Sequence, residues 1–553
     1  MMVKRNDTLR VYVVFGCVIL TAGLVGWKLF MLSYVRHTLY AQTAQAQSDN
    51  INNLLFRGNI YIQDPGSPGS DGLYLAATNK KFPLAYVIPA SIADPAAAAQ
   101  KLNAILGIDA EKLNSAINGK SDQLKVVARR LTDEQVTAVS ELNMKGVGIR
   151  YETDRNYPGG PLLATVLGFL GYGDKGRAGQ YGIEAYFNAE LSGAAERSGQ
   201  APRPADIMLT IDRNIQSFAE EKLAGLMTKW QAKGGTIIVQ DPKTGRILAM
   251  ADRPSFNPNA YSASESSSYV NRSIQNIFEP GSSFKPITMA AGLDMGKVSP
   301  NTTYTDPGFI DIAGYKIKNF DGLAHGTVTM TTVLEKSLNT GAAYVQGLLG
   351  QDDFLNYVVN FGFGQRTGID LPAETNGSIA NLYSGRQINF VTSSFGQGIA
   401  VTPLQLINAY SAIANGGRLM RPYVVDAIRH EGGKTETTSP EVVGIPISEK
   451  TSQKLRQMLV SVVDNGFDKA RIKGYDIAGK TGTAQIADRK GGYEEDAFIH
   501  DFVGFAPASD PRFVVLIKMD RPQGITFAAD SLSPTFREIA QYLITYFNIP
   551  PTR

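Results

Sequence analysis

The longest apolar stretch in the sequence is an uncharged run over residues 11–27. It continues past Lys28 to residue 32, and a lysine at such a place can extend its ammonium group to water while its stem stays in apolar surroundings. The run reaches the length of a short membrane-spanning helix. The distribution of positive charge predicts a cytoplasmic N-terminus and an exported remainder, because three basic residues precede the run: Lys4, Arg5 and Arg10.

A cleaved signal peptide is the alternative interpretation of this run. Residues 44–46, Ala-Gln-Ala, resemble a cleavage site, but they lie too far beyond the apolar run for normal processing. Arg36, just outside the run, is a mild departure from the charge rule. We therefore expect residues 1–10 to form a cytoplasmic tail and residues 11–32 to form an uncleaved transmembrane anchor.

Residues 33–205 mix strand-like and helix-like patterns and gather no catalytic constellation. Two strands are predicted at residues 57–64 and 73–77, joined as a hairpin by a long turn rich in proline and glycine. Residues 94–142 are rich in helix formers. A polar Pro/Gly-rich segment over residues 193–204 indicates a domain junction. We expect an N-terminal pedestal, or dimerisation-like domain, over residues 33–205.

From residue 206 onward the pattern is that of a layered α/β domain. Strand patterns occur at both ends of this segment, and helical patterns dominate between residue 282 and about residue 460. Strands from the two ends can share one sheet with helices packed on its faces. We therefore expect an α/β (α+β) domain over residues 206–553, with strands at residues 236–240, 246–251, 475–486, 502–506 and 512–519 and a final helix at residues 535–547.

Composition argues against several classes of function. The formal net charge of +3 gives no strong attraction to nucleic acid. The single cysteine, Cys17, lies in the apolar run, so the rest of the chain has no disulfide framework, thiolate metal site or cysteine nucleophile. The four histidines show no close metal-ligand spacing. We expect no metal, no cofactor and no histidine-based triad.

A candidate nucleophile lies at the start of a predicted buried helix. A Pro-Gly turn precedes Ser282, and the apolar run over residues 287–295 predicts the helix. Lys285 follows three residues later, which brings its amine to the same side of the helix as the hydroxyl. A helix start favours developing negative charge, and a serine needs a base to become a strong nucleophile. Chance alone would supply roughly one or two such Ser-x-x-Lys pairs in a chain of this length.

Two further motifs follow this pair in order. Ser337-Leu338-Asn339 comes after a predicted helix over residues 331–336, and Lys480-Thr481-Gly482-Thr483 lies within a predicted strand. Each motif alone is weak, since Ser-x-Asn is usually a turn or a cap. The ordered set at domain-scale spacing is far more specific, and it is the set of class A β-lactamases and penicillin-binding proteins.

The chain resembles a class B, high-molecular-weight penicillin-binding protein, a monofunctional peptidoglycan D,D-transpeptidase of cell division or elongation. The resemblance implies an antiparallel five-stranded sheet packed by helices, a pedestal domain and one transmembrane helix. The chain departs from the family in the lengthened turn at residues 65–72 and at residues 465–470, which lack the Gly-Thr-Ala often found there. Otherwise the resemblance covers nearly the whole chain and includes Arg57-Gly58-x-Ile60, Arg155-x-Tyr157-Pro158, Gly182-Ile183-Glu184, His325-Gly326, Gly396-Gln397-Gly398 and residues 502–507.

The resemblance implies catalytic roles for four residues. Ser282 would attack the penultimate D-Ala carbonyl of a pentapeptide stem, D-Ala would leave, and an amine of a neighbouring stem would take the acyl group. Lys285 would be the base, kept neutral by burial or by a second cation. Ser337 would relay the proton to the leaving amine. Asn339 would hold Lys285 and hydrogen-bond the substrate amide.

The Lys-Thr-Gly strand would bind the substrate. Lys480 would be the second cation and would also bind the terminal carboxylate, to which Thr481 and Thr483 would offer hydroxyls around Gly482. The backbone N–H groups of Ser282 and Thr483 would form the oxyanion hole. We expect the Gly396-Gln397-Gly398 segment to be a turn under the site and His325 to be a packing or hydrogen-bonding residue.

Three functions are compatible with these features. The leading one is a membrane-anchored transpeptidase that crosslinks pentapeptide stems and is inhibited by β-lactams. A D,D-carboxypeptidase or β-lactamase would share the acyl-enzyme but use water, and the anchor and pedestal argue against it. A β-lactam sensor or a silent divisome scaffold is disfavoured by the intact motifs. The resemblance further implies a location in the bacterial cytoplasmic (inner) membrane and a SEDS-family glycosyltransferase partner among divisome or elongasome proteins, and the short pedestal favours a septal over a lateral role.

Overall fold

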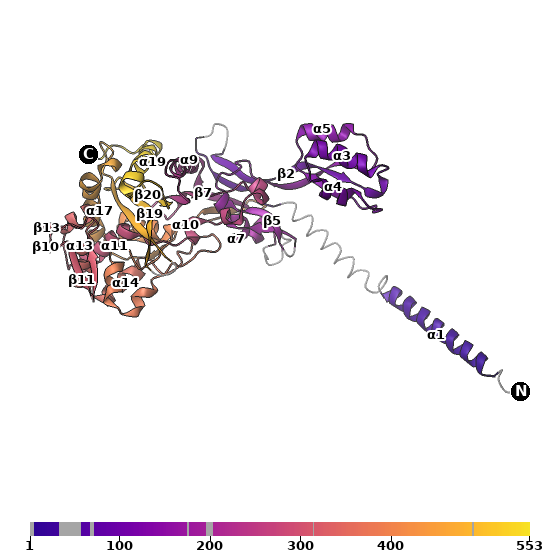
Figure 1. The fold of residues 1–553 in the computed structure, drawn as a ribbon, viewed down its shortest axis with the longest axis horizontal. Helices are drawn as coiled ribbons and strands as arrows, with labels where there is room; N and C mark the ends of the chain where they lie inside the picture. Colours follow the sequence, from indigo (N-terminus) through magenta and orange to yellow (C-terminus); the bar gives the residue numbers. More distant parts are fainter. Residues whose placement is uncertain are drawn as a thin grey trace. The chain divides into compact units, whose positions relative to one another are not determined.

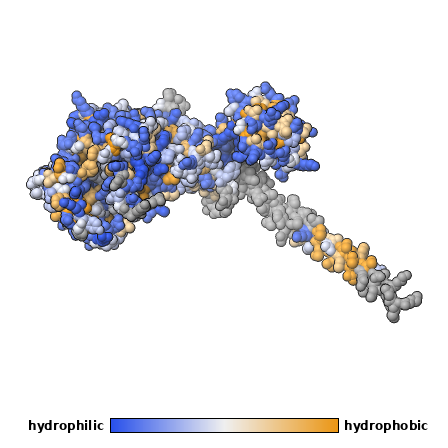
Figure 2. All heavy atoms as spheres, viewed as in Figure 1, coloured by the Kyte–Doolittle hydropathy of each residue, from blue (hydrophilic) through white to orange (hydrophobic). Residues whose placement is uncertain are grey.

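The computed structural model describes residues 5–31, 57–66, 71–173, 176–194, 203–312, 314–488 and 492–553. The chain divides into two compact units, Met1–Arg57 and Gly58–Arg553. The first unit contains helix α1 (Arg5–Phe30). Its segment Val11–Lys28 has a mean hydropathy of 1.8 and is not buried, and Figure 2 shows an apolar surface along it. This helix is long and apolar enough to cross a membrane, whereas Arg36 and the cleavage-like residues 44–46 lie outside the described residues.

The second unit begins with a seven-stranded sheet, in which β7 (Asp206–Asp212) pairs in parallel with β1 (Ile60–Gln63). The predicted hairpin is confirmed, because β1 pairs antiparallel with β2 (Leu73–Val87), although residues 67–70 of the turn lie outside the described residues. The second strand is ten residues longer than predicted. The sheet order is β16-β15-β7-β1-β2-β3 with β4 also on β2, the remaining strands being β3 (Lys125–Arg129), β4 (Val147–Asn156), β15 (Val425–Arg429) and β16 (Thr435–Thr437).

The region predicted as helical over residues 94–142 contains three helices and one strand. The helices are α3 (Pro95–Leu106), α4 (Ala110–Ile117) and α5 (Asp133–Glu141). A capping box at Thr132 and Gln135 begins α5. The prediction is wrong for β3, a short strand that pairs with β2.

Strands from both sides of the predicted junction share this sheet. β1 precedes the junction segment and β7 follows it, and β15 comes from far later in the chain. Part of the junction, residues 195–202, lies outside the described residues. Before it lie β5 (Phe169–Gly173), β6 (Gly176–Gln180) and the short helices α6 (Ala164–Leu167), α7 (Gly182–Tyr186) and α8 (Asn188–Ser192).

A five-stranded antiparallel sheet forms the centre of the remaining part, in the order β18-β19-β20-β8-β9. The early strands β8 (Gly234–Gln240) and β9 (Ile247–Arg253) lie beside the late strands β18 (Ala478–Ala487), β19 (Tyr493–Ala506) and β20 (Phe513–Asp520). The prediction of one sheet built from both ends of the segment is therefore confirmed. Figure 1 shows β19 and β20 among the helices that pack around them.

Helices cover both faces of this sheet. α9 (Arg213–Trp230) and α19 (Ser533–Tyr546) contact each other and the strands, and Phe536 of α19 stacks on Phe502 of β19. On the opposite face, Ser411 of α16 (Pro403–Ala414) donates a hydrogen bond to the side chain of Gln240. The further helices are α10 (Arg272–Gln275), α11 (Lys285–Asp294), α12 (Met330–Glu335), α13 (Asn339–Leu349), α14 (Gln351–Asn360), α15 (Gln387–Ser393), α17 (Glu449–Ser461) and α18 (Ala528–Ser531).

Short strand pairs interrupt the helical region, and the sequence did not predict them. β11 (Phe309–Ile312) and β12 (Tyr315–Lys318) form a small hairpin, and β10 (Thr303–Asp306) pairs with β13 (Gly326–Thr329). A third pair joins β14 (Leu419–Met420) to β17 (Val442–Gly444).

Candidate active site

Ser282 lies in a one-turn 3₁₀ helix, η5 (Gly281–Phe284), that runs directly into α11. Gly281 has a φ of +57°, a backbone conformation that glycine adopts without strain. Ser283, Phe284 and the residues from Lys285 to Leu293 are buried. The predicted buried helix is therefore confirmed, and Ser282 lies just ahead of it.

The amine of Lys285 connects two serines. Its Nζ lies 3.0 Å from Oγ of Ser282 and 3.1 Å from Oγ of Ser337, and it also donates to the main-chain carbonyl of Ser337. Lys285 is 1% exposed, and burial lowers its pKa well below the usual value, helped by the charge of nearby Lys480. A neutral amine at this distance can accept the proton of a serine hydroxyl. The structure thus places the predicted nucleophile beside the predicted base.

The Ser-x-Asn segment approaches this amine from the turn between α12 and α13. Ser337 has a φ of +55°, a left-handed conformation that is strained for residues other than glycine. Asn339 donates from Nδ2 to the carbonyl of Lys318 at the end of β12, over 2.8 Å. This contact differs from the prediction that Asn339 holds Lys285, since within the described residues Ser337 supplies the contacts from this segment to the amine.

The Lys-Thr-Gly segment lies in β18, the edge strand of the sheet, next to η5. Thr483 Oγ1 accepts a hydrogen bond from the backbone N–H of Ala528 over 3.1 Å, which leaves its own proton for a ligand. Lys480 is 1% exposed and donates to the carbonyl of Thr481 over 3.0 Å. Burial lowers the pKa of Lys480 to about 8, and the carboxylate of Asp501 opposes this effect. The charge of Lys480 therefore acts from beneath the strand.

A cavity of about 530 Å³ lies over these groups, within the size range of small-molecule sites. The predicted residues that line it are Ser282, Ser337, Asn339, Thr481 and Thr483. Lys285 and Lys480 are buried behind it, and Gly482 lies in the strand between the two threonines. All eight predicted residues therefore come from the three segments that meet at one cavity.

Two neighbouring predictions are also confirmed. The Gly396-Gln397-Gly398 segment is a turn under the site, because the carbonyl of Gly396 accepts a hydrogen bond from the N–H of Gly281 over 3.0 Å. Gln397 lines the cavity. His325 is a hydrogen-bonding residue, with Nε2 2.8 Å from Asp321 Oδ2 and Nδ1 3.3 Å from the Nζ of Lys336.

The sequence reasoning missed an aromatic pair at the cavity. Phe320 and Phe527 line it with their ring centroids 5.0 Å apart in an edge-to-face arrangement, and they are 63% and 41% exposed. Such exposed rings offer an apolar contact to a bound ligand. Neither lies in a recognisable motif, so only their juxtaposition in space reveals them.

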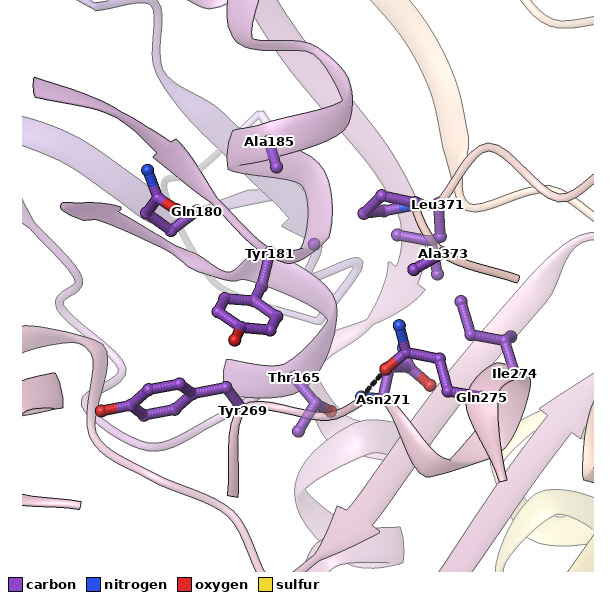
Figure 3. Close-up of a pocket in the computed structure, with 12 residues that line it drawn as sticks. Thr165, Gln180, Tyr181, Ala185, Tyr269, Asn271, Ile274, Gln275, Leu371 and Ala373 are labelled. Carbon is purple, nitrogen blue, oxygen red and sulfur yellow. Dashed lines mark hydrogen bonds between the residues drawn. The ribbon is translucent and has the colours of Figure 1, made fainter. Parts of the chain in front are cut away.

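A second cavity, of about 270 Å³, is lined by β6, α7 and the segments at residues 269–275 and 371–373. Figure 3 shows Tyr181 and Tyr269 on one side of it and Gln275 and Ala373 on the other. No side chain that lines it carries a formal charge, and no serine or lysine is among them. The predicted nucleophile and the predicted base both lie at the cavity over Ser282, so that cavity is the candidate active site.

Comparisons with known proteins match the architecture described above. The family model of the penicillin binding protein transpeptidase domain matches residues 235–541, and that of the penicillin-binding protein dimerisation domain matches residues 56–201. Stage V sporulation protein D of Bacillus subtilis is 33% identical over 505 residues, which are 86% of this chain and 77% of that protein. The probable peptidoglycan D,D-transpeptidase PenA of Neisseria gonorrhoeae is 28% identical over 569 residues, 96% of this chain and 94% of that protein.

Solved structures give the same result. Penicillin-binding protein 3 of Mycobacterium tuberculosis, in complex with aztreonam, is 30% identical with a TM-score of 0.67, over 73% of this chain and 92% of that chain. A peptidoglycan synthetase from Bifidobacterium adolescentis is 25% identical with a TM-score of 0.68, over 90% of this chain and 96% of that chain.

Proposed function

Because this chain belongs to the penicillin-binding protein family of peptidoglycan D,D-transpeptidases, we propose that Ser282 carries the acyl group from one stem peptide to another. Its Oγ attacks the carbonyl carbon of the penultimate D-Ala, the peptide C–N bond breaks, and the terminal D-Ala leaves as an amine. The amine of a second stem then attacks the ester, which releases Ser282 and forms the crosslink. The contact of 3.0 Å between Lys285 Nζ and Ser282 Oγ, buried beneath the cavity, carries this proposal.

Protons move through Lys285 and Ser337. The neutral amine of Lys285 takes the hydroxyl proton as Ser282 attacks. Ser337, 3.1 Å from the same amine and facing the cavity, passes a proton to the departing D-Ala nitrogen. Acylation and deacylation use this path in opposite directions, so the enzyme ends each cycle in its starting protonation state.

The edge strand β18 and the turn before Asn339 bind the substrate. Hydroxyls of Thr481 and Thr483 face the cavity and bind the terminal carboxylate, with the charge of Lys480 beneath them. Asn339 lines the cavity and binds the substrate amide. The backbone N–H groups of Ser282 and Thr483 stabilise the oxyanion, where a donor is typically worth ~3–4 kcal/mol.

Acylation by a fluorescent penicillin tests the nucleophile. The wild-type chain should carry a stable adduct on Ser282, found by intact mass and peptide mapping, and Ser282→Ala should carry none. Ser217→Ala, an exposed serine on α9, is the matched control and should label like the wild type. Lys285→Met should lower the labelling rate by about 10²–10⁴-fold. No adduct on folded wild type would leave a scaffold function, and rapid loss of the label would favour a hydrolase.

The anchor assignment is a second part of the proposal. Helix α1 is an uncleaved single-pass anchor with its N-terminus in the cytoplasm and the catalytic unit outside the bacterial cytoplasmic membrane, supported by the apolar segment Val11–Lys28. Alkaline phosphatase fused to the C-terminus should be active, because the fusion places it outside the cytoplasmic membrane. A reporter enzyme that works only in the cytoplasm, fused to the C-terminus instead, should be inactive, and its activity would contradict the orientation.

The cellular role is the third part. We infer that the enzyme acts in septal rather than lateral wall synthesis and is inhibited by β-lactams, together with a SEDS-family glycosyltransferase in the same membrane. A fluorescent fusion should therefore gather at division sites, and labelling along the side wall would contradict this role. Purification from the native membrane should recover the glycosyltransferase, and its absence would contradict the partnership.

A further inference from the structure

Asp501 lies on β19 beside the centre of the Lys-Thr-Gly strand. The antiparallel register places it opposite Gly482 of β18 and opposite Lys518 of β20. Opposed residues in antiparallel strands point to the same face of the sheet, as do residues two apart in one strand. Asp501 therefore shares its face with Lys480, its diagonal neighbour across the strand pair.

The carboxyl group of Asp501 is buried against the nucleophile turn. Asp501 is 0% exposed, and within the described part of the chain neither of its carboxyl oxygens has a hydrogen-bond partner. A Cβ atom on Gly482 would lie 2.2 Å from Oδ2 of Asp501 and 2.4 Å from the carbonyl oxygen of Pro280. Because Gly482 has no side chain, the carboxyl group of Asp501 fits beneath the strand and beside the turn that contains Ser282.

Groups from four packed elements face this carboxyl. Lys518 has a carboxylate partner of its own in Asp520, with which it forms an ion pair. The hydroxyl of Ser283 donates to the carbonyl of Pro280 over 2.9 Å and has Asp501 as a second possible acceptor. The groups are Lys480 from β18, Lys518 from β20, Ser283 from η5 and Tyr410 from α16.

Lys480 depends on Asp501 in a way that Lys518 does not. Lys480 is buried and has no direct ion pair among the described residues, and Asp501 is the carboxylate whose charge acts on it. Burial raises the pKa of Asp501 to about 7, against the opposing effects of Ser283, Lys480 and Lys518. A carboxylate that is ionised above neutrality can therefore hold the proton on Lys480.

We propose that Asp501 is a positioning residue for the transpeptidase reaction: its carboxylate keeps Lys480 protonated beneath the substrate-binding strand, and Lys480 in turn keeps the amine of Lys285 neutral. This inference rests on the proposed function of Ser282, Lys285 and Lys480. Burial alone would remove the proton from both lysines. Because Asp501 lies next to Lys480, Lys480 keeps its proton and can bind a carboxylate. Lys285 stays neutral and can accept a proton.

Removal of the Asp501 charge should shift the titration of Lys480 toward lower pH. Lys480 would then lose its proton closer to neutrality, so the cavity would lose its buried cation and Lys285 would lose the charge that lowers its pKa. The loss of the buried cation weakens acylation on the alkaline side of its pH profile, where Lys285 is neutral in either case.

The test is the rate of acylation by a fluorescent penicillin across a range of about pH 5 to 10, with the full chain in detergent. In the wild type, the alkaline fall in rate should follow the loss of the Lys480 proton. In Asp501→Asn, the midpoint of that fall should move about one pH unit lower. A purely structural role for Asp501 would change the amplitude of the profile but leave its midpoint in place.

Asp252→Asn is the matched control. Across the sheet, Asp501 lies opposite Lys518, Lys518 opposite Thr236, and Thr236 opposite Asp252. Asp252 is 2% exposed and lies three strands away from Asp501, at a distance of roughly 14 Å. It accepts hydrogen bonds from the hydroxyls of Thr236 and Ser273. Asp252→Asn makes the same change of a buried carboxyl to an amide without touching Lys480, so the alkaline midpoint should stay at the wild-type value.

An unchanged midpoint in folded Asp501→Asn would overturn the inference, as would an equal shift in Asp252→Asn. If Asp501→Asn fails to fold, Asp501→Thr removes the same charge with a side chain that suits a strand, and it must show the same shift. Failure of the proposed function looks different, because then the wild type itself would form no adduct on Ser282 at any pH.

Discussion

Substitution of Gly396 by alanine measures how firmly the surroundings fix Ser282. Gly396 has a φ of +80°, and its carbonyl accepts a hydrogen bond from the N–H of Gly281. A Cβ atom at this position would lie 2.2 Å from the carbonyl oxygen of Gly281. An ordinary non-bonded contact needs about 3.5 Å, so the turn and the segment before Ser282 must separate by about 1 Å.

Two costs follow, and they affect different measurements. The left-handed backbone of an alanine costs about 1–2 kcal/mol of folding stability. The displacement acts on the rate, since a shift of about 1 Å in a reacting group can cost about 10²-fold. That factor corresponds to about 2.7 kcal/mol in the activation free energy. We therefore expect Gly396→Ala to fold and to be acylated about a hundred times more slowly.

Gly107→Ala separates the two costs. Gly107, at the end of α3, also has a left-handed backbone, with a φ of +63°, but a Cβ atom there would have no neighbour within 4 Å. It should lose similar stability in thermal unfolding and keep its rate of acylation by a fluorescent penicillin. If folded Gly396→Ala reacts within about threefold of the wild type, this turn does not position Ser282.

Three further outcomes are expected elsewhere in the chain. Arg155 and Glu184 form a buried ion pair with an N–O distance of 2.6 Å. Arg155→Met should lower the free energy of unfolding in urea by about 3–5 kcal/mol, and the Arg155→Met/Glu184→Leu double variant should lower it by less. Equal losses in the two variants would argue against pairing. Burial lowers the pKa of His500 to about 4 from about 6.5 in the unfolded chain, so its stabilising contribution is present above pH ~6.5 and falls by about 3 kcal/mol as the pH drops toward 4. Urea unfolding of His500→Gln should lack this pH-dependent part, and a difference from wild type that does not vary with pH would contradict it. Phe320→Ala should raise the KM for a stem-peptide substrate roughly tenfold at unchanged kcat, because the ring contacts ligand rather than core, and a fall in kcat alone would contradict this.

The three motifs could be located from the sequence because each is a short segment with its own local signal. The Pro-Gly turn before Ser282 and the apolar run after Lys285 predict a buried helix start, and the structure has one. The Lys-Thr-Gly segment lies within a predicted strand, and β18 confirms that strand. The three motifs meet at one cavity because the sheet order brings strands from both ends of the domain together.

Two errors in the prediction have local causes. Strand β2 runs on to Val87 through Pro83, a residue that normally argues against a paired strand, yet the register with β4 continues on both sides of it. The small β11–β12 hairpin has no strong pattern of its own, and its last residue, Lys318, is the acceptor for Asn339. The unexpected contact of Asn339 thus follows directly from a hairpin that the sequence did not reveal.

Asp501 escaped sequence analysis for a different reason. It precedes the apolar Phe502-Val503 pair in a strand, where a carboxyl residue has low strand propensity and no motif marks it. Its neighbourhood with Lys480 depends on the register of two strands that are joined by a connection partly outside the described residues. A slip of one residue would place the carboxyl on the opposite face. Pairing across strands, rather than residue type, therefore determines its chemistry.

The protonation state that the reaction requires follows from counting the buried charges. Lys285, Lys480 and Asp501 are each at most 1% exposed, so apart from the Lys518–Asp520 pair the site encloses two potential cations and one potential anion. A buried charge without an opposite charge nearby costs roughly several kcal/mol, which favours one charged lysine near the carboxylate and one neutral lysine. Asp501 acts on Lys480, whereas Lys285 is surrounded by two hydroxyls and a carbonyl that suit a neutral amine. This count favours a neutral Lys285 in the folded site before any substrate binds, which is the state that its proposed role as a base requires.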